Sequence, residues 1–365
     1  MSRRHTVLNL IPYPQTFSFG WVNKYQFLSY YLLLVTLLLH PLAAGAVDIT
    51  QQLHRPLSSS FGRQSRDEAD KLLRISQQQY HAGAAAKAIE SGLQALNIYH
   101  LIGDVKAKGS TYDLLARAYI QLGLYKEGED ALRRQLAIAR DTHDFQSQIF
   151  ALNNLATLFL QAGEPIPAGK TVEEALKIAH NVKNIEGEGL SLSNLGLVSA
   201  RLGDYNQAIK LYETALKYRR QTGDINGELN TLNNLGDVYL AAGNYPDTIG
   251  TYGAALRMAK INSDRTNQLR AIDGLVAAHS AVGRYERAFE LLQQRLILAQ
   301  QSQNLREQLN SFESYAQLYE QLGNYSTARN FYERAIILSQ TLEDSKKEVF
   351  LRDRVTQMLK KPGRR

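Results

Sequence analysis

The sequence contains no cysteine in its 365 residues, so disulfide bonds, thiolate nucleophiles and cysteine-based metal sites are excluded. This shortage does not decide the compartment, because an exported protein need not contain cysteine. Proline is also scarce, with 8 residues, which argues against long disordered linkers. Tryptophan occurs once, and the aromatic fraction of 9% is almost entirely tyrosine and phenylalanine.

The middle of the sequence lacks an excess of positive charge, although the formal net charge of the whole chain is +7. Residues 1–46 contain three Lys or Arg and no acid, and residues 346–365 contain eight Lys or Arg against two acids. The stretch between them is therefore slightly acidic, which excludes a basic nucleic-acid-binding surface on the body of the chain. The basic C-terminal tail can contact anionic lipid or nucleic acid, and a solvated terminus is the simpler interpretation.

The N-terminal residues have the features of a targeting segment. Residues 27–39 form an uncharged apolar run, FLSYYLLLVTLLL, and Ala44 and Ala46 match the small-x-small pattern that signal peptidase cleaves. We therefore expect 1–46 to be a signal peptide. A membrane anchor is the alternative, because 25–47 is long enough to cross a bilayer. Either segment would place the body outside the cytoplasm, as a periplasmic, lumenal, secreted or membrane-anchored protein, after a polar linker over 47–65.

The rest of the sequence repeats with a period of 40 residues and without insertions. One column is always glycine, at positions 83, 123, 163, 203, 243, 283 and 323. A second column is always Asp or Asn, at positions 104, 144, 184, 224, 264, 304 and 344. Seven copies in one register indicate an array of seven identical structural units.

The composition of one unit predicts a helical hairpin. Leu232, Leu235 and Val238 recur at three-residue steps, which places them on one face of a helix. Asp224 can cap the start of that helix. Gly243 and the residue after it form the turn to a second helix, where a glycine avoids the steric cost of an unusual backbone conformation.

These columns resemble the tetratricopeptide repeat. The resemblance is carried by Leu232, Leu235, Gly236, Tyr239, Gly243, Tyr245, Tyr252 and Ala255, and one repeat earlier by Leu192, Leu195, Gly196, Gly203, Tyr205, Ala208, Tyr212 and Ala215. The period exceeds the usual length of about 34 residues and is similar to the long variant of Pins/LGN-type adaptors and MalT-type arrays. The resemblance implies an all-α, right-handed superhelical solenoid of about seven helix–turn–helix repeats over 66–340. A capping helix and basic tail would follow over 341–365.

No part of the sequence predicts catalysis. Residues 163–171, GEPIPAGKT, approach a phosphate-binding loop, but one residue too many separates its two glycines and a helical turn is expected there. The 8 histidines include no pair at i, i+4 spacing that would suggest a metal site. We therefore expect a protein that is not an enzyme, with no catalytic, cofactor-binding or metal-binding residues.

The resemblance implies that the first helix of each repeat lines a concave groove for a protein or peptide partner. Asn154, Asn194 and Asn234 occupy one groove column, and each amide offers a donor and an acceptor to a bound backbone. Inherited repeat sequence on a solvated face is the alternative interpretation of this column. The predicted groove residues are Phe150, Asn154, Leu190, Asn194, Arg201, Asn230, Asn234, Asp237, Arg270, Asn310 and Gln317.

These observations favour a protein–protein interaction scaffold or adaptor on the extracytoplasmic side of a membrane, where it would aid assembly of a complex. Membrane association would come from the N-terminal segment, and no nucleic acid is expected as a partner. The alternative function is a sensor or regulatory module that binds a signal peptide or ligand and changes shape. The sequence leaves the partner and the oligomeric state open.

Overall fold

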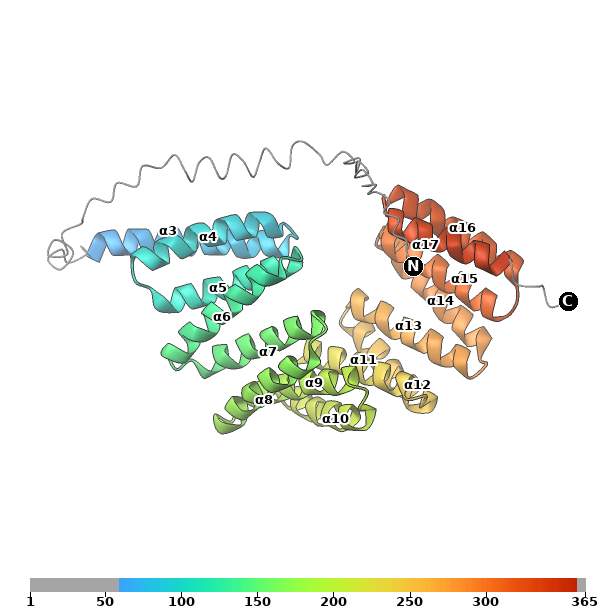
Figure 1. Cartoon of the computed structure of the whole chain (residues 1–365), viewed down its shortest axis with the longest axis horizontal. Helices are drawn as coiled ribbons and strands as arrows, with labels where there is room; N and C mark the ends of the chain where they lie inside the picture. The colour runs from blue at the N-terminus through green and yellow to red at the C-terminus, as the bar shows by residue number, and fades with distance from the viewer. Residues whose placement is uncertain (1–58, 360–365) are drawn as a thin grey trace, which may run out of the picture. The chain divides into compact units, whose positions relative to one another are not determined.

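The computed structural model describes residues 59–359, which contain α-helices and no strand (Figure 1). The helices are α3 (Ser59–His81), α4 (Ala85–Leu101), α5 (Val105–Gln121), α6 (Tyr125–Asp141), α7 (Phe145–Gln161), α8 (Pro165–Asn181), α9 (Ile185–Arg201), α10 (Tyr205–Thr222), α11 (Ile225–Ala241), α12 (Tyr245–Ile261), α13 (Arg265–Ala281), α14 (Tyr285–Gln301), α15 (Leu305–Gln321), α16 (Tyr325–Thr341) and α17 (Ser345–Leu359). The signal peptide or anchor expected at 1–46 lies outside the described residues. Within them, none of the helices combines the length and apolar character that crossing a membrane requires.

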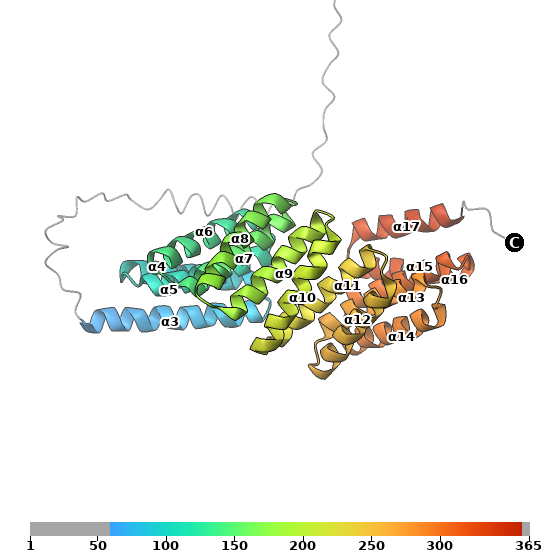
Figure 2. The same ribbon diagram turned by 90° about the horizontal axis from the view of Figure 1, so that it is seen from below.

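The helices pair into seven hairpins, from α3–α4 (repeat one) to α15–α16 (repeat seven) (Figure 2). Ala69 of α3 packs with Ala95 and Tyr99 of α4, and from α4 onward each helix packs against the next one in the chain. The first helices α7, α9, α11 and α13 also contact one another in sequence, so they form one continuous face of the array. The all-α solenoid expected from the sequence is confirmed. Helix α3 begins at Ser59, so the last residues of the stretch expected to be a linker, 47–65, are helical.

The column of Asp and Asn caps the first helix of each repeat from α5 onward, as its position predicts. Each side chain accepts a hydrogen bond from a backbone N–H three residues later; between Gly227 N and Asp224 Oδ1 the distance is 2.8 Å. The capping residues are Asp104, Asp144, Asn184, Asp224, Asp264 and Asn304, and Asp344 caps α17 in the same way. These local bonds help to start a helix at the same point of every period.

The turns explain why glycine recurs within the hairpins. At Gly203 the backbone has a φ of +82°, in the left-handed region that L-residues with a side chain adopt at a cost. The turns between hairpins also contain a residue in the left-handed region, but there it is often not glycine. His143, Lys183, Ser263, Gln303 and Glu343 all have φ values between +52° and +56° there.

The core runs along the array between first and second helices. Tyr212 and Tyr252, at 0% and 1% exposure, place their rings against the first helix of the same repeat. Gly196 and Gly236 make room for these rings, because a Cβ at either glycine would lie 2.8 Å from the facing tyrosine. The glycine and tyrosine of the repeat signature are therefore one packing unit.

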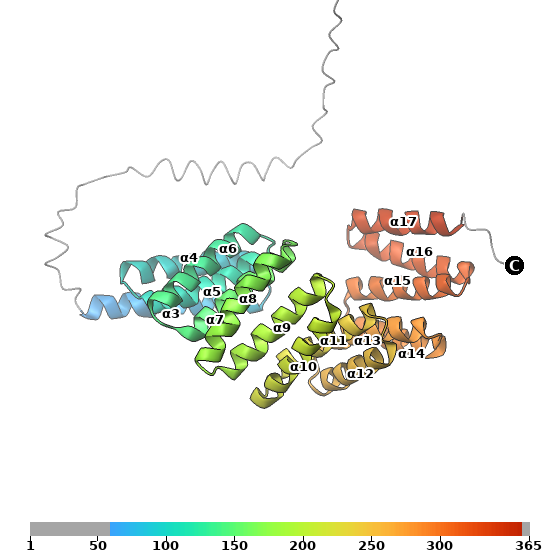
Figure 3. The same ribbon diagram turned by 60° about the horizontal axis from the view of Figure 1, so that its bottom comes forward.

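The array ends in the capping helix expected from the sequence. Helix α17 packs against α16 (Figure 3). It buries Leu351 and Met358. Its exposed side carries charged residues such as Lys346, Arg352 and Asp353 together with Val349 and Phe350, while its buried side covers the last apolar face of the solenoid.

Candidate functional site

The groove face contains a cavity of about 300 Å³, which is formed by residues of α9, α10, α11 and α13. Four predicted groove residues line it, Arg201, Asn234, Asp237 and Arg270, and the remaining lining residues are Leu197, Ala200, Tyr205, Tyr212, Val238 and Ala241. We call it the α9–α13 cavity. The structure thus brings together side chains from three different repeats, as stacking of the first helices predicts.

One wall of the cavity is a connected polar network. The guanidinium of Arg270 donates to Asn234 Oδ1 at 2.7 Å and also forms an ion pair with Asp237. The hydroxyl of Tyr252 donates to the same carboxylate of Asp237. Burial, and then this hydrogen bond, raise the pKa of Tyr252 well above its usual range, so the phenol stays protonated and holds Asp237 in place.

The opposite wall carries a buried hydroxyl without a partner. Tyr212 is fully buried, and its Oη forms no hydrogen bond within the described residues. Its pKa is raised by burial and then by the charge of Asp237, while Arg270 and Arg201 oppose the shift. Leaving a buried hydroxyl unpaired costs about 1–3 kcal/mol. Native proteins seldom keep such a group unless a ligand or water satisfies it.

The sequence explains why Tyr212 differs from its counterparts. In the next repeat Tyr252 is paired with Asp237, and the residue one period before Asp237 is Leu197. Tyr332, in the same column, is paired with Glu320 instead. Tyr212 therefore lacks an acceptor because an aliphatic side chain occupies the acceptor's position.

The asparagine column lies beside a second, buried column that the sequence did not distinguish from it. Asn153 and Asn233 are 1% and 0% exposed, and they bond between first helices: Asn153 to Ser191 at 2.9 Å and Asn233 to Asn267 at 2.7 Å. The sequence has two adjacent asparagines at 153–154 and again at 233–234, and this pattern could have indicated a second polar column.

The outer column is partly used by the protein itself. Asn194 donates to Asn153 Oδ1 at 2.8 Å, and Asn234 accepts from Arg270. Asn194 Oδ1, Asn234 Nδ2 and the whole amide of Asn154 carry no bond in the described part of the chain. Whether this column binds a partner stays a prediction.

The other predicted groove residues lie outside the α9–α13 cavity. Phe150 and Leu190 are half-buried, and Asn230 is exposed. Asn310 lines a neighbouring cavity of about 430 Å³ together with Arg270. Gln317 lines a cavity of about 570 Å³ between α13 and α15 that repeats the position of the α9–α13 cavity two periods later. There Ala281 replaces Arg201 and Gln317 replaces Asp237, so this lining contains one charged side chain, Asp273, where the α9–α13 cavity has three.

Among residues 59–359, no group of three or more histidines and carboxylates is arranged to hold a metal ion. The glycine-rich stretch 163–171 forms the turn before α8 and the first residues of that helix, as the repeat register predicts. The arrangement is suited to binding through hydrogen bonds, charge and shape.

Capped hairpins of equal length, stacked in register, define an α-solenoid of helix–turn–helix repeats. The chain contains tetratricopeptide repeats: models of this repeat family match residues 109–142, 188–261 and 309–341. No curated protein matches the sequence.

Solved structures share this fold at low sequence identity. The apo form of RapI is 14% identical with a TM-score of 0.60, over 76% of this chain and 100% of that one. A Rap protein complexed with competence and sporulation factor is 16% identical with a TM-score of 0.56, over 76% of each chain. A signal transduction ATPase with a tetratricopeptide repeat sensor, from Pyrococcus horikoshii, is 19% identical with a TM-score of 0.59, over 80% of this chain and 46% of that one. These similarities establish the fold.

Proposed function

We propose that the chain is a non-enzymatic interaction scaffold that binds a segment of a partner protein along the face formed by α7, α9, α11, α13 and α15. The observation that carries this proposal is the α9–α13 cavity, where the buried hydroxyl of Tyr212 has no partner within the described residues. A bound segment that supplies a polar group there would remove the cost of that unpaired hydroxyl.

The charges of the cavity favour an acidic group on the partner. Arg201 is exposed at the rim and forms no ion pair with a described residue, and Arg270 shares its charge with a single carboxylate, Asp237. A carboxylate between the two guanidinium groups could also accept from Tyr212. Charge-assisted bonds of this kind are stronger than neutral ones, so this contact would anchor the segment.

The comparisons support binding as the use of this fold. A Rap protein with the same fold was crystallised with competence and sporulation factor, which is an example of such an array holding a ligand. The similar array described as a sensor in the Pyrococcus horikoshii ATPase supports the second candidate, a sensor or regulatory module that changes shape on binding. The two functions differ in the consequence of binding, and both use the groove.

We further propose that the array lies outside the cytoplasm and aids assembly of a complex at a membrane. The proposal rests on the apolar run at 27–39 and the small residues Ala44 and Ala46. Protease added to the outer side of an intact cytoplasmic membrane should therefore digest the array without that membrane being opened. A body that fractionates with cytosol would refute this location.

The groove is tested by comparing Tyr212→Phe with Tyr332→Phe in a pull-down by the full chain from a membrane extract. Tyr212→Phe removes only an unpaired hydroxyl, so stability should hold or rise by about 1 kcal/mol while partners recovered by the wild type are lost. Tyr332→Phe removes the hydroxyl bonded to Glu320, so it should lower stability by about 0.5–1.5 kcal/mol and keep the partners.

The asparagine column is tested in the same assay with Asn154, Asn194 and Asn234 all replaced by alanine. We expect this variant to fold and lose partners, with some loss of stability because Asn194→Ala removes the donor to the buried Asn153 Oδ1. Recovery of every partner by both Tyr212→Phe and the triple variant would exclude this face as the binding site.

A further inference from the structure

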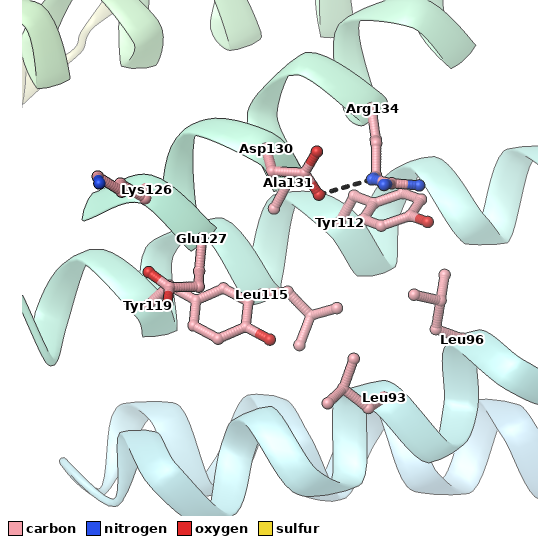
Figure 4. A pocket seen from close by; sticks show the side chains of 10 residues that line it. All are labelled: Leu93, Leu96, Tyr112, Leu115, Tyr119, Lys126, Glu127, Asp130, Ala131 and Arg134. Atoms are coloured by element: carbon pink, nitrogen blue, oxygen red, sulfur yellow. Dashed lines mark hydrogen bonds and ion pairs between the residues drawn. The ribbon is translucent and has the colours of Figure 1, made fainter. Parts of the chain in front are cut away.

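A second cleft lies away from the groove, between α4, α5 and α6, and has a volume of about 450 Å³ (Figure 4). Its floor is apolar and aromatic, with Leu93 from α4 and Leu115 and Tyr119 from α5, and Ala131 of α6 leaves one side open. Arg134 stands at the rim, 6.0 Å above the ring of Tyr112. We call this the α4–α6 cleft.

In repeat seven, the space equivalent to this cleft is occupied by a side chain of the protein itself. Five periods later, the counterpart of Ala131 is Phe331. The ring of Phe331 stacks on the aromatic residues of α15, with centroids 4.8 Å from Tyr315 and 5.6 Å from Tyr319. Arg334, the counterpart of Arg134, lies 5.5 Å above the ring of Phe331.

Repeat two therefore has the surroundings of this ring without the ring. Tyr119 matches Tyr319 as the surface to stack on, and Arg134, which forms an ion pair with Asp130 at 2.7 Å, matches Arg334 as the cation above. Leu115 replaces the larger Tyr315, which widens the space further. Cavities of about 150 Å³ already bind benzene, so the α4–α6 cleft has room for a phenyl or phenol ring.

Leu93 adds apolar surface at the mouth of this cleft. It is 45% exposed, and its column in the six later repeats contains only polar, charged or glycine residues: Arg133, Glu173, Glu213, Gly253, Gln293 and Glu333. A leucine at a position that is otherwise solvated adds apolar surface only at the mouth of this cleft. Leu93 therefore extends the apolar lining formed by Leu96 and Leu115 to the surface of the molecule.

We infer that the α4–α6 cleft is a docking site for an aromatic side chain, Phe or Tyr, of a protein partner. The guest ring occupies the place that Phe331 takes in repeat seven, stacked on Tyr119 and covered by Arg134. The positive guanidinium complements the negative face of an aromatic ring, which distinguishes this guest from an aliphatic one. The docking site is separate from the groove and does not depend on it.

The test uses the full chain, labelled at its leucine methyl groups, and N-acetyl-phenylalaninamide as the probe. We expect the methyl signals of Leu93 and Leu115 to shift as the probe is added, through the ring current of the bound phenyl group. N-acetyl-leucinamide should bind about tenfold more weakly, because it gains neither stacking nor the cation–π contact. Tyr212→Phe should leave probe binding unchanged, which separates this site from the groove.

Two variants decide the assignment. Ala131→Phe places the chain's own ring in the cleft and should abolish the shifts. Leu93→Glu introduces the residue that its column has in other repeats and should weaken probe binding about tenfold while the fold is kept. Leu101→Glu, at a position 71% exposed on the same helix but outside the cleft, is the matched control and should bind like the wild type.

Several results would overturn the inference. They are probe binding by Ala131→Phe at wild-type strength, equal binding of the leucine and phenylalanine amides, and equal effects of Leu93→Glu and Leu101→Glu. A concentration-dependent dimer that Leu93→Glu dissolves would show that a second copy of the chain, rather than a partner's ring, covers the cleft. If Ala131→Phe does not fold, the comparison of Leu93→Glu with Leu101→Glu still decides.

Discussion

Replacing Gly274 with alanine should destabilise the array, whereas the same change at Gly250 should stabilise it. A Cβ on Gly274 would lie 2.2 Å from two ring atoms of Tyr252. At Gly250, inside α12, no heavy atom lies within 4 Å of the added Cβ. The two glycines therefore share a helical setting and differ in the space beside them.

The size of the effect follows from that difference. Ordinary contact between carbon atoms is about 3.5–4.0 Å, so the ring of Tyr252 must withdraw by more than about 1 Å. The ring is 1% exposed and its hydroxyl is bonded to Asp237, so it has nowhere to move without cost. Overpacking of this kind costs about 1–3 kcal/mol, while glycine to alanine in a helix gains up to about 1 kcal/mol. We expect Gly250→Ala to be more stable than Gly274→Ala by about 1–3 kcal/mol.

Urea unfolding followed by circular dichroism measures this difference, and hydrogen exchange shows where it arises. Helices of repeat arrays can unfold separately, so we expect faster exchange in α11, α12 and α13 of Gly274→Ala than in the distant α5 and α6. Equal stability of the two variants would refute the packing of Tyr252 against Gly274. A loss of protection spread evenly over the array would contradict the local origin of the effect.

Two further predictions concern pH and turn geometry. Burial, and then the charges of Arg284 and Arg287, lower the pKa of His279 below its usual value of 6.5. The unfolded chain then binds this proton more readily, so the free energy of unfolding should fall as the pH drops below about 6.5. His279→Tyr should remove that part of the pH dependence. If urea titrations give the variant and the wild type the same dependence of the free energy of unfolding on pH, the assignment to His279 is wrong. Gly203→Val should lower stability by at least about 1–2 kcal/mol, because φ there is +82°, and Gly203→Asn should cost less; equal urea midpoints for the valine variant and the wild type would count against this turn.

The fold could be predicted from the sequence because its determinants act over short distances. Asp224 caps the helix that begins at the next residue, and Gly243 forms the turn beside it. Since the period is kept through seven copies, the geometry of one hairpin applies to all of them. The stacking then follows from the apolar columns, which each hairpin can bury only against its neighbours.

The site could be predicted only in part, because its features depend on which side chains face each other across repeats. Successive residues of a helix are separated by about 100° around its axis, and the sequence did not show whether Asn153 or Asn154 faces the neighbouring helix. The structure buries Asn153 and uses one half of the Asn194 amide to bind it.

Tyr212 illustrates the same limit more sharply. The repeat signature assigns it to the core, which is correct for its ring. The sequence does not reveal that its hydroxyl is unpaired. The structure shows that the equivalent hydroxyl of Tyr252 donates to Asp237, and that Leu197, at the position equivalent to Asp237, offers Tyr212 no acceptor. The α4–α6 cleft likewise becomes evident only in the structure, where Phe331 fills in repeat seven the space that Ala131 leaves open in repeat two.

From Ala85 onward a helix begins every twenty residues, and three residues connect successive helices except between α10 and α11, where there are two. A recombination event between two copies of the repeat would therefore delete or add a whole hairpin and leave every side-chain column in place. Such events could lengthen or shorten the binding face in a single step, provided that α17 stays at the end to cover the last apolar surface. The middle of the array is thus free to vary in length over evolution, while the capping helix is not.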